Sequence, residues 1–572
     1  MTTINTIRNI FYSLFILNAG NFLGQEMTLS HKNGYHGEIF TLIATCPNCS
    51  EIKYSLDGSD PSTGEILKNQ LIISNALIPQ EKIALKPTTA IPNTSNNVEW
   101  HTWKPPGHYD RAIAIKVAGY KDNQRITDIH YRTFFFEENW DNFPTSSLFI
   151  NVNDFYNDTV GISVPGIHAE PNNSVWTGNY HKKGHNWEKE IHWTFLRKGK
   201  TKQDKNLGVR IHGLKTGSAP QKSFRLYARN KYGSKSIKYK FNNNSKKKHK
   251  RILLRSLYSG HSSRLINDVV AHELSRPLDL EIMDYGFSRT YINGEYWGLH
   301  IIRERVDEKY LSEHFNCNED SILIPGNYNQ AEFQELFDFI DSHMMSLDEN
   351  LSSFGKLIDL SNFTDYVICE TFFSNQDWLL QNNNITFWKE KGKGKWRLVL
   401  IDIDAGFQHP EDNMFEFMQL HKESMITKIF NAVITNKNYQ TDFTNRYAEL
   451  LNTYLSPTRC FKIIDSISNI IAPHLPAHID RWGHPTSTFA WNKDLDNMRS
   501  FVNDRATIIS SEISNSLQLN TSNFGTVKTV HFISQDQKLI ALVLIVLGIM
   551  FSVIIRIRKR TKLRNVKKSG LT

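Results

Sequence analysis

The chain has 572 residues, more than one hydrophobic core usually serves, so the sequence predicts at least two domains. With 40% hydrophobic, 22% charged and 12% aromatic residues, it has the composition of a globular protein, which excludes a largely disordered chain. The net charge of +9 does not indicate nucleic-acid binding, because a C-terminal basic cluster supplies eight of these charges.

Residues 1–24 are predicted to be a signal peptide. Arg8 precedes the apolar run Ile10–Leu17, and cleavage is expected between Ala19 and Gly24. No A-x-A cleavage site is present, so an uncleaved membrane anchor is the alternative.

Residues 27–138 are predicted to form a small antiparallel β-domain. Apolar and polar residues alternate in the runs EIFTLIA, EIKYSLD, RAIAIKVAGY and HYRTFFF, which is the pattern of half-buried strands. Asp57–Pro61 (DGSDP) has the composition of a tight turn. Cys46 and Cys49 form a lone C-x-x-C, for which a local disulfide or two free thiols are both favoured over zinc, which requires four ligands.

Residues 146–517 are predicted to form a mixed α+β domain. The runs LGVRIHGL, SFRLYAR, RILLRSL, FSRTYI, GLHIIRE and WRLVLIDID indicate strands, while SRLINDVVAHEL, LSNFTDYVICETFF and several stretches after Asp412 have helical spacing. The basic run Lys246–Arg251 follows a polar segment and is interpreted as a solvated loop, with a substrate-docking site as the alternative.

The C-terminal region predicts a membrane anchor. Residues 518–537 read as a polar stalk and residues 538–556 as one transmembrane helix, since Leu539–Ile555 carries no charge and spans roughly 25 Å as a helix. Residues 557–572 are basic, and basic flanks collect on the cytoplasmic side, so the bulk of the chain is expected outside the cytoplasm.

No Walker loop, zincin motif, nucleophile elbow or Rossmann fingerprint occurs. Instead, the chain carries in order a lysine in a predicted strand, an acid in a helix, an aspartate before an asparagine cluster, and two aspartates after an apolar strand. Phosphoryl transfer uses these groups to hold ATP phosphates, orient the acceptor hydroxyl and bind Mg²⁺.

Two family resemblances follow from these motifs. GVRIHGLKTGSAPQKSFRLYAR, with four further segments in the same order from about Leu148 to His409, resembles the spore-coat protein H (CotH) kinases. IKYSLDGSDPS and the strand runs after it resemble the C-terminal β-sandwich module of chitobiases and hexosaminidases. The resemblances imply an atypical, kinase-like two-lobed domain behind a small all-β sandwich, whose carbohydrate binding is a further possibility.

The CotH resemblance implies roles for several residues. Lys222 would contact the ATP phosphates, with Arg225 and Glu304 also at the nucleotide. Glu273 would pair with Lys222, although Arg264 or Asn267 of the same segment could face the site instead.

The later motifs supply the base and the metal ligands. NQDWLLQNNNITFWK places Asp377 as the base for the acceptor hydroxyl and leaves Asn382, Asn383 and Asn384 as alternative metal ligands. In WRLVLIDIDAGF, Asp402 would be the principal Mg²⁺ ligand and Asp404 a second one, because side chains two residues apart share one face of a strand.

The sequence therefore predicts a membrane-anchored kinase that transfers the γ-phosphoryl group of ATP to Ser or Thr of secreted or surface proteins, with Mg²⁺ or Mn²⁺ as the metal. The alternative is a non-catalytic surface protein of the same fold that acts in adhesion or assembly. ATP is scarce outside the cytoplasm, which favours that alternative. Adjacent carboxylates that cost stability without a metal favour the enzyme.

Overall fold

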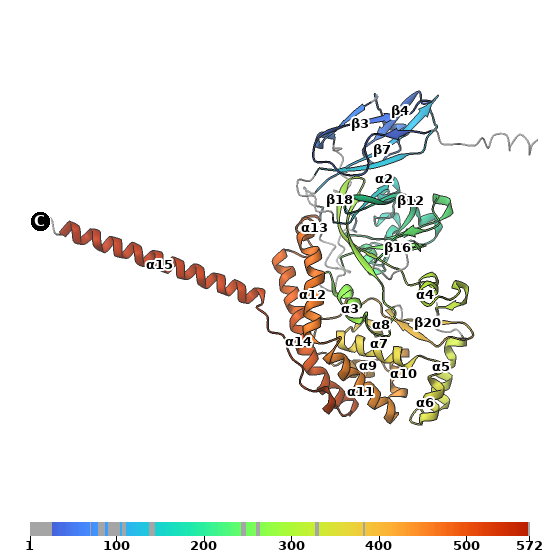
Figure 1. Cartoon of the computed structure of the whole chain (residues 1–572), viewed down its shortest axis with the longest axis vertical. Coiled ribbons are helices and arrows are strands. Elements are labelled where there is room, and N and C mark those ends of the chain that lie inside the picture. Colours follow the sequence, from blue (N-terminus) through green and yellow to red (C-terminus); the bar gives the residue numbers. More distant parts are fainter. Residues whose placement is uncertain are drawn as a thin grey trace, which may run out of the picture. The chain divides into compact units, whose positions relative to one another are not determined.

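The computed structural model describes residues 26–68, 70–77, 86–89, 103–105, 110–136, 143–241, 248–258, 264–325, 331–380 and 384–569. The chain forms two compact units. The first unit comprises Met1–Ser256, Gly286–Arg303 and Asp480–Trp482, and the second comprises Leu257–Tyr285, Glu304–Ile479 and Gly483–Thr572. Strands dominate the first and helices the second, so the predicted mixed α+β class is confirmed (Figure 1). The expected signal peptide lies outside the described residues.

The N-terminal region of the first unit contains two β-sheets around a shared apolar core. The core includes Leu42, Ile73, Ile115 and Phe134. One sheet has the order β1 (Thr28–Leu29), β3 (Phe40–Thr45), β6 (Gln70–Ile73). The other has the order β2 (Gly34–Tyr35), β9 (His130–Phe135), β7 (Ile113–Lys121), β4 (Glu51–Ser55), β5 (Glu65–Ile66). Each of the four alternating runs in the sequence therefore forms a strand.

Two local predictions in this region are confirmed. In the DGSDP turn, Asp57 Oδ1 accepts a hydrogen bond of 2.9 Å from the backbone N of Ser59. Gly58 has a φ of +84°, a backbone conformation that is strained for residues with a side chain. Cys46 and Cys49 form a disulfide, whereas the three other cysteines are free.

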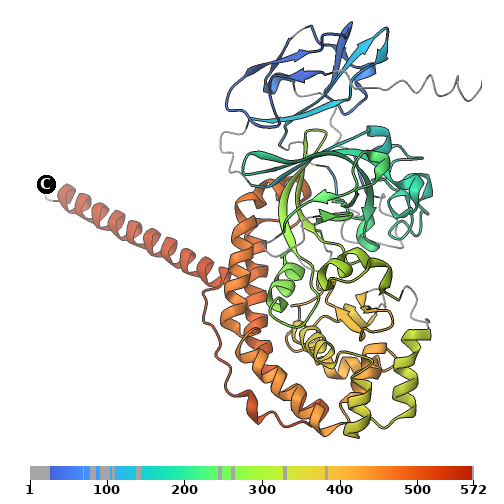
Figure 2. The same cartoon turned by 45° about the vertical axis from the view of Figure 1, so that its right-hand side comes forward.

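A closed seven-stranded barrel follows the two sheets (Figure 2). Its interior is filled by apolar side chains such as Trp193, Leu226 and Ile252. Around the barrel the strands are β10 (Thr145–Ile150), β11 (Lys189–Arg197), β12 (Lys200–His212), β13 (Ser223–Tyr227), β16 (Arg251–Ser256), β18 (Glu295–Arg303) and β17 (Tyr285–Ile292).

The basic run is only partly described and is not simply a loop. Lys246 and Lys247 lie outside the described residues, while Lys248–His249 forms β15, which pairs with β14 (Ile237–Lys238). Backbone pairing thus overrides the loop prediction at these two residues.

The N-terminal sheets pack directly on the barrel. The backbone N of Ala112 donates to the carbonyl of Gly294 at 2.7 Å, in the turn between β17 and β18. The Tyr131 ring stacks on the His192 ring with centroids 3.9 Å apart. Sheets and barrel are therefore parts of one compact unit.

The first unit also includes a short segment from far along the chain. Arg481, at the end of α13 (Leu475–Trp482), is fully buried, and its guanidinium lies over the rings of Trp103, Trp297 and Trp482 at 5.4, 4.8 and 4.2 Å. Buried cation–π contacts of this kind stabilise by about 2 kcal/mol.

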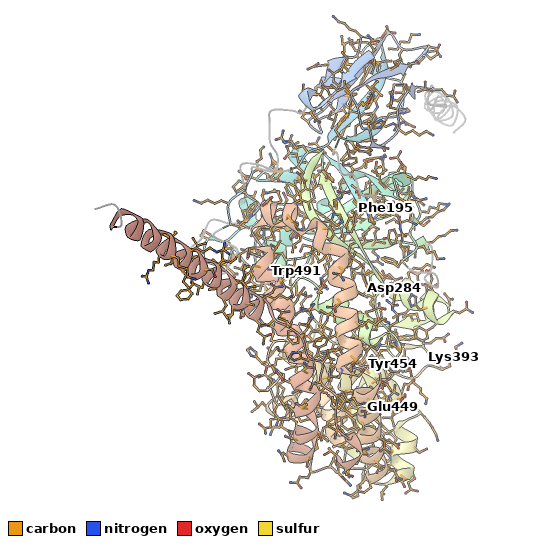
Figure 3. The ribbon with its side chains drawn as sticks, turned by 60° about the vertical axis from the view of Figure 1, so that its left-hand side comes forward. Phe195, Asp284, Lys393, Glu449, Tyr454 and Trp491 are labelled. Atoms are coloured by element: carbon orange, nitrogen blue, oxygen red, sulfur yellow. A yellow bond between two sulfur atoms is a disulfide. The ribbon has the colours of Figure 1, made fainter. Side chains whose placement is uncertain are left out.

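Helices and one small sheet build the second unit. α12 (Pro457–Ile471) and α14 (Thr488–Leu517) lie side by side (Figures 1 and 2). Trp491 of α14, labelled in Figure 3, donates its indole N–H to the carbonyl of Arg264 at 2.9 Å. The small sheet has the order β19 (Ile322–Leu323), β20 (Thr386–Glu390), β21 (Arg397–Val399). The helical region predicted after Asp412 is confirmed.

The chain's last described element is the long helix α15 (Gln535–Ser569). Its segment Gln535–Lys559 is the one helix of the described residues that is long and apolar enough to cross a membrane, and its most apolar stretch is fully exposed. Because the helix begins at Gln535, the last three residues of the expected stalk are helical.

Candidate active site

The predicted base and one predicted metal ligand meet at the end of a buried helix. α7 (Leu360–Phe373) is followed by Ser374, whose φ of +52° turns the chain, and Asp377 then begins α8 (Asp377–Leu380). Asn384 is buried and donates its Nδ2 to Asp377 Oδ2 at 2.8 Å. The other two candidates, Asn382 and Asn383, lie outside the described residues.

Asp402 and Asp404 do not lie on a strand. β21 ends at Val399, and Asp402 has a left-handed backbone with a φ of +58°. The alternation expected for a strand end is therefore wrong here. Left-handed conformations of residues other than glycine cost about 1–3 kcal/mol and cluster at functional sites.

The backbone of this Asp402 segment is held by α3 (Asn267–Ser275). The backbone N of Ile403 donates to Asp268 Oδ1 at 3.1 Å. Asn267 Nδ2 donates to the carbonyls of Asp404 and Gly406, each at 2.9 Å. Asn267 was an alternative to Glu273 at the sequence level, and it contacts the Asp404 backbone.

The segments of Asp377 and Asp402 are bonded to each other within the second unit. The backbone N of Phe407 donates to the carbonyl of Phe373 at 2.7 Å. The buried guanidinium of Arg505, from α14, donates to the carbonyls of Thr371 at 2.7 Å and Pro410 at 2.9 Å. Residues far apart in sequence thus form one polar region at the end of α7.

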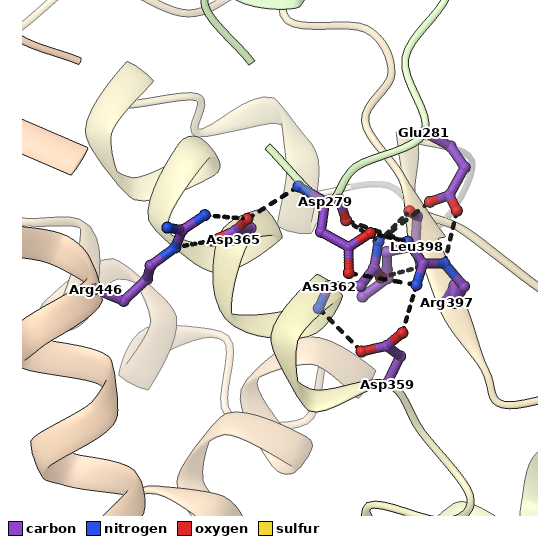
Figure 4. Close-up of polar contacts among 8 residues, drawn as sticks. All are labelled: Asp279, Glu281, Asp359, Asn362, Asp365, Arg397, Leu398 and Arg446. Carbon is purple, nitrogen blue, oxygen red and sulfur yellow. Dashed lines mark hydrogen bonds and ion pairs between the residues drawn. The ribbon is translucent and has the colours of Figure 1, made fainter. Parts of the chain in front are cut away.

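An ion network fixes the strand that leads into Asp402. Arg397 of β21 bonds three carboxylates (Figure 4): Glu281 Oε1 at 2.7 Å, Asp279 Oδ1 at 2.7 Å, and Asp359. Glu281 is nearly fully buried, so its charge requires this partner.

The start of α7 is tied to the same strand. Asn362 of α7 exchanges two hydrogen bonds with the backbone of Leu398, at 2.7 and 3.3 Å. Asp365, one turn further along α7, binds Arg446 through both carboxylate oxygens and also accepts from the backbone N of Asp279 (Figure 4). These contacts set the position of α7 relative to β21.

Lys222 belongs to the first unit and is fully buried, immediately before β13. Its Nζ donates to the carbonyls of Gly217 and Ala219, both at 2.8 Å, and lies 4.3 Å from the centre of the Tyr180 ring. Burial lowers the pKa of Lys222 well below its usual value. Loss of hydration is therefore what disfavours the charged form of this amine.

The other predicted nucleotide contacts have local partners. Arg225 on β13 bonds His212 Nδ1 at 2.6 Å, which joins the two halves of the R-x-H-G and K-S-F-R motif. Glu273 forms an ion pair with Arg276 at 3.0 Å. Its predicted partner Lys222 belongs to the other unit, so that pairing stays a prediction. Glu304 is buried and accepts from the backbone N of Asp284 at 3.1 Å.

Oxygen donors at this region suit a hard divalent cation. Among the described residues, no three His, Cys, Asp or Glu side chains lie close enough together to hold a metal ion. Mg²⁺, however, is commonly bound by one or two carboxylates together with waters and substrate phosphates. The carboxylates of Asp402 and Asp404 and the amide oxygen of Asn384 are ligands of these chemical types.

Residues 209–509 of the chain match the family model described as CotH kinase protein, which is more than half of its length. The chain belongs to the CotH kinase family. The CotH match contains both the Lys222 motif and the Asp377 and Asp402 segments, and membership of this family implies a kinase that uses ATP. No curated protein matches the chain. The N-terminal sheets precede the CotH match.

Sequence reasoning missed Arg505 and Glu370 at the end of α7. Arg505 lies 98 residues beyond Phe407, where the last motif segment ends, and nothing in its local sequence marks it. Glu370 stands out only as an acid in the apolar run VICETFF, a position where a carboxylate is costly to bury.

Proposed function

We propose that this CotH kinase transfers the γ-phosphoryl group of ATP to Ser or Thr hydroxyls of secreted or surface proteins. The observation that supports the proposal is the hydrogen bond from Asn384 to Asp377, together with the bond from Phe407 to Phe373 that joins the Asp402 segment to the end of α7. Phosphoryl transfer uses an aspartate to orient the acceptor hydroxyl, and an asparagine with a second aspartate to hold the metal, and the two segments carry these residue types.

The proposed roles follow the family motif. Asp377 accepts the proton of the hydroxyl, and its hydrogen bond from Asn384 holds the carboxylate in place. Asp402 and Asp404, with Asn384 or its neighbours Asn382 and Asn383, would hold Mg²⁺ or Mn²⁺. The bound metal would neutralise charge on the phosphates during transfer.

Lys222, Arg225, Glu273 and Glu304 are the proposed nucleotide residues. Lys222 Nζ donates to the carbonyls of Gly217 and Ala219. To bind a phosphate, it would have to replace these two hydrogen bonds by bonds to phosphate oxygens. A phosphate would also favour the charged form of the amine.

The remaining architecture is proposed from the same resemblances. The CotH region, residues 146–517, would be a two-lobed kinase-like domain, and residues 27–138 a chitobiase-type β-sandwich that serves as an accessory module. We propose that α15 anchors the chain in a membrane with its basic end in the cytoplasm and the site outside.

One observation favours a second function, namely a non-catalytic surface protein. The Cys46–Cys49 disulfide fits an oxidising compartment outside the cytoplasm, where ATP is scarce. In this alternative the same fold would serve adhesion or assembly without phosphoryl transfer.

Radiolabelled ATP with Mg²⁺ or Mn²⁺ separates the two functions. The full chain in detergent is compared with Asp377→Ala and Asp402→Ala, and with Glu335→Gln as an exposed control outside the site. Labelling of the wild type and the control, but of neither site variant, is the expected result. Equal labelling of all four would refute the assignment of Asp377 and Asp402. Absence of nucleotide binding to the wild type would support the adhesion protein.

A further inference from the structure

Glu370 is a fully buried acid near the end of α7, and the proposed roles above do not use it. Its neighbours in the helix are buried apolar or aromatic side chains such as Val367, Ile368 and Phe372. A carboxyl group at such a place loses its hydration and must be compensated by hydrogen bonds or by a proton.

The side chain of Glu370 bonds the turn that carries Asp377. Asn375 Nδ2 donates to Glu370 Oε2 at 2.9 Å, and the backbone N of Asn375 donates to the carbonyl of Glu370 at 3.2 Å. Asn375 is itself fully buried, and its Oδ1 has no hydrogen-bond partner among the described residues. The Asn375 side chain therefore depends on Glu370 for its position.

The turn passes this position on to the proposed base. Asn375 precedes Asp377 by two residues, and its carbonyl accepts from the backbone N of Trp378 at 3.4 Å. A shift of Asn375 would displace the start of α8, and with it the Asp377 carboxylate. Displacements of about 1 Å at a reacting group can reduce a rate 100-fold.

Burial makes an ionised Glu370 unfavourable. It raises the pKa of Glu370 to about 8, with repulsion from Asp402 and Asp268 adding to it, whereas the hydrogen bond from Asn375 opposes the rise. A neutral carboxylic acid can hold the Asn375 amide without adding a negative charge beside Asp402.

We infer that Glu370 is a positioning residue of the phosphoryl-transfer site, which acts as the hydrogen-bond acceptor that fixes the Asn375 turn and thereby aims Asp377. The inference rests on the proposed kinase function. It assigns Glu370 no contact with the nucleotide or the acceptor, and it predicts an effect on turnover rather than on ATP binding.

Two substitutions of nearly the same size separate this role from simple packing. Glu370→Gln keeps an oxygen acceptor for Asn375, whereas Glu370→Met keeps the length but offers only a weak sulfur acceptor. In the full chain, ADP formation is measured with casein as acceptor, and thermal unfolding by near-UV circular dichroism reports the fold. Glu335→Gln, at an exposed position, is the control for an acid outside the site.

Glu370→Gln is expected to keep kcat within about threefold of the wild type. Glu370→Met is expected to lower kcat roughly 10- to 100-fold with KM for ATP within about twofold, in chains that remain folded. Equal kcat for a folded Glu370→Met variant, or an equal loss in both variants, would overturn this inference alone. If Glu370→Met does not fold, the Gln variant together with Asn375→Leu provides the same comparison. A wild type that forms no ADP would overturn the kinase function and this inference with it.

Discussion

Asp402 combines a left-handed backbone with the proposed role of principal metal ligand. Glycine adopts a φ of +58° without strain, whereas other residues pay about 1 kcal/mol or more for it. We expect Asp402→Gly to raise the free energy of unfolding by about 1 kcal/mol relative to Asp402→Ala, while both variants lose phosphoryl transfer. Urea unfolding and radiolabel transfer on the same preparations measure the two effects. A less stable glycine variant would show that the backbone at 402 is not strained.

Lys222 predicts a pH dependence of stability. Because its pKa is lower in the folded chain than its usual 10.5, the unfolded chain binds more protons at pH values between the two. The free energy of unfolding should therefore rise with pH through this window, by up to about 1.4 kcal/mol per pH unit, and level off above about 10.5.

Lys222→Met removes this titration, so its unfolding curve should rise less steeply than that of the wild type between pH 7 and 10. At pH 7 the variant should be at least as stable as the wild type, because an apolar side chain of similar length suits a fully buried position. Urea unfolding at several pH values provides the measurement. Parallel pH profiles for the two proteins would mean that Lys222 titrates normally.

At the scale of elements, β21 is the link between the ion network and the Asp402 segment. Arg397→Met would leave the buried carboxylate of Glu281 without its cation, which is expected to cost about 3 kcal/mol of unfolding free energy. Adding Glu281→Met should restore part of this loss, because the buried charge is then removed. Chemical unfolding of the two single variants and the double variant measures the coupling. Strictly additive losses would show that the pair is not coupled.

Sequence patterns predicted most elements but not how they end. The strand runs and helical spacings predicted five of the seven barrel strands, namely β12, β13, β16, β17 and β18, and helices α3 and α7, since periodicity follows directly from backbone geometry. The strand predicted from WRLVLIDID ends at Val399. Beyond it, the backbone of Ile403 and Asp404 bonds the side chains of Asp268 and Asn267, and an apolar run in the sequence gives no sign of such tertiary hydrogen bonds. Asn384 was one of three candidate metal ligands, and the sequence did not indicate its hydrogen bond to Asp377. The contact of Arg505 with Thr371 could not be predicted, because the two residues are far apart in sequence and only the fold brings them together.

At the scale of the whole molecule, the N-terminal sheets are more than an appended module. Ala112 bonds the barrel at Gly294, in the turn that joins β17 and β18, and Tyr131 stacks on His192 of β11. The sequence could indicate the strands of both parts but not this packing, because the contacting residues are ordinary turn, aromatic and polar residues. Assays of the kinase therefore call for chains that keep the N-terminal sheets.

The C-terminal helix predicts how the chain is held at a membrane. An arginine at the centre of a membrane-spanning helix costs about 2.5–3.5 kcal/mol on insertion scales. The double variant Leu544→Arg, Leu547→Arg in α15 should therefore move the protein from the membrane pellet to the supernatant after alkaline carbonate extraction. Leu544→Phe, Leu547→Phe is the matched control and should stay in the pellet, because both changes remain apolar. The two residues lie outside the candidate site, so detergent-solubilised protein should keep its ATP turnover in both variants. If the arginine variant stays in the pellet, α15 is not the anchor, and the proposed placement of the site outside the cytoplasm loses its support.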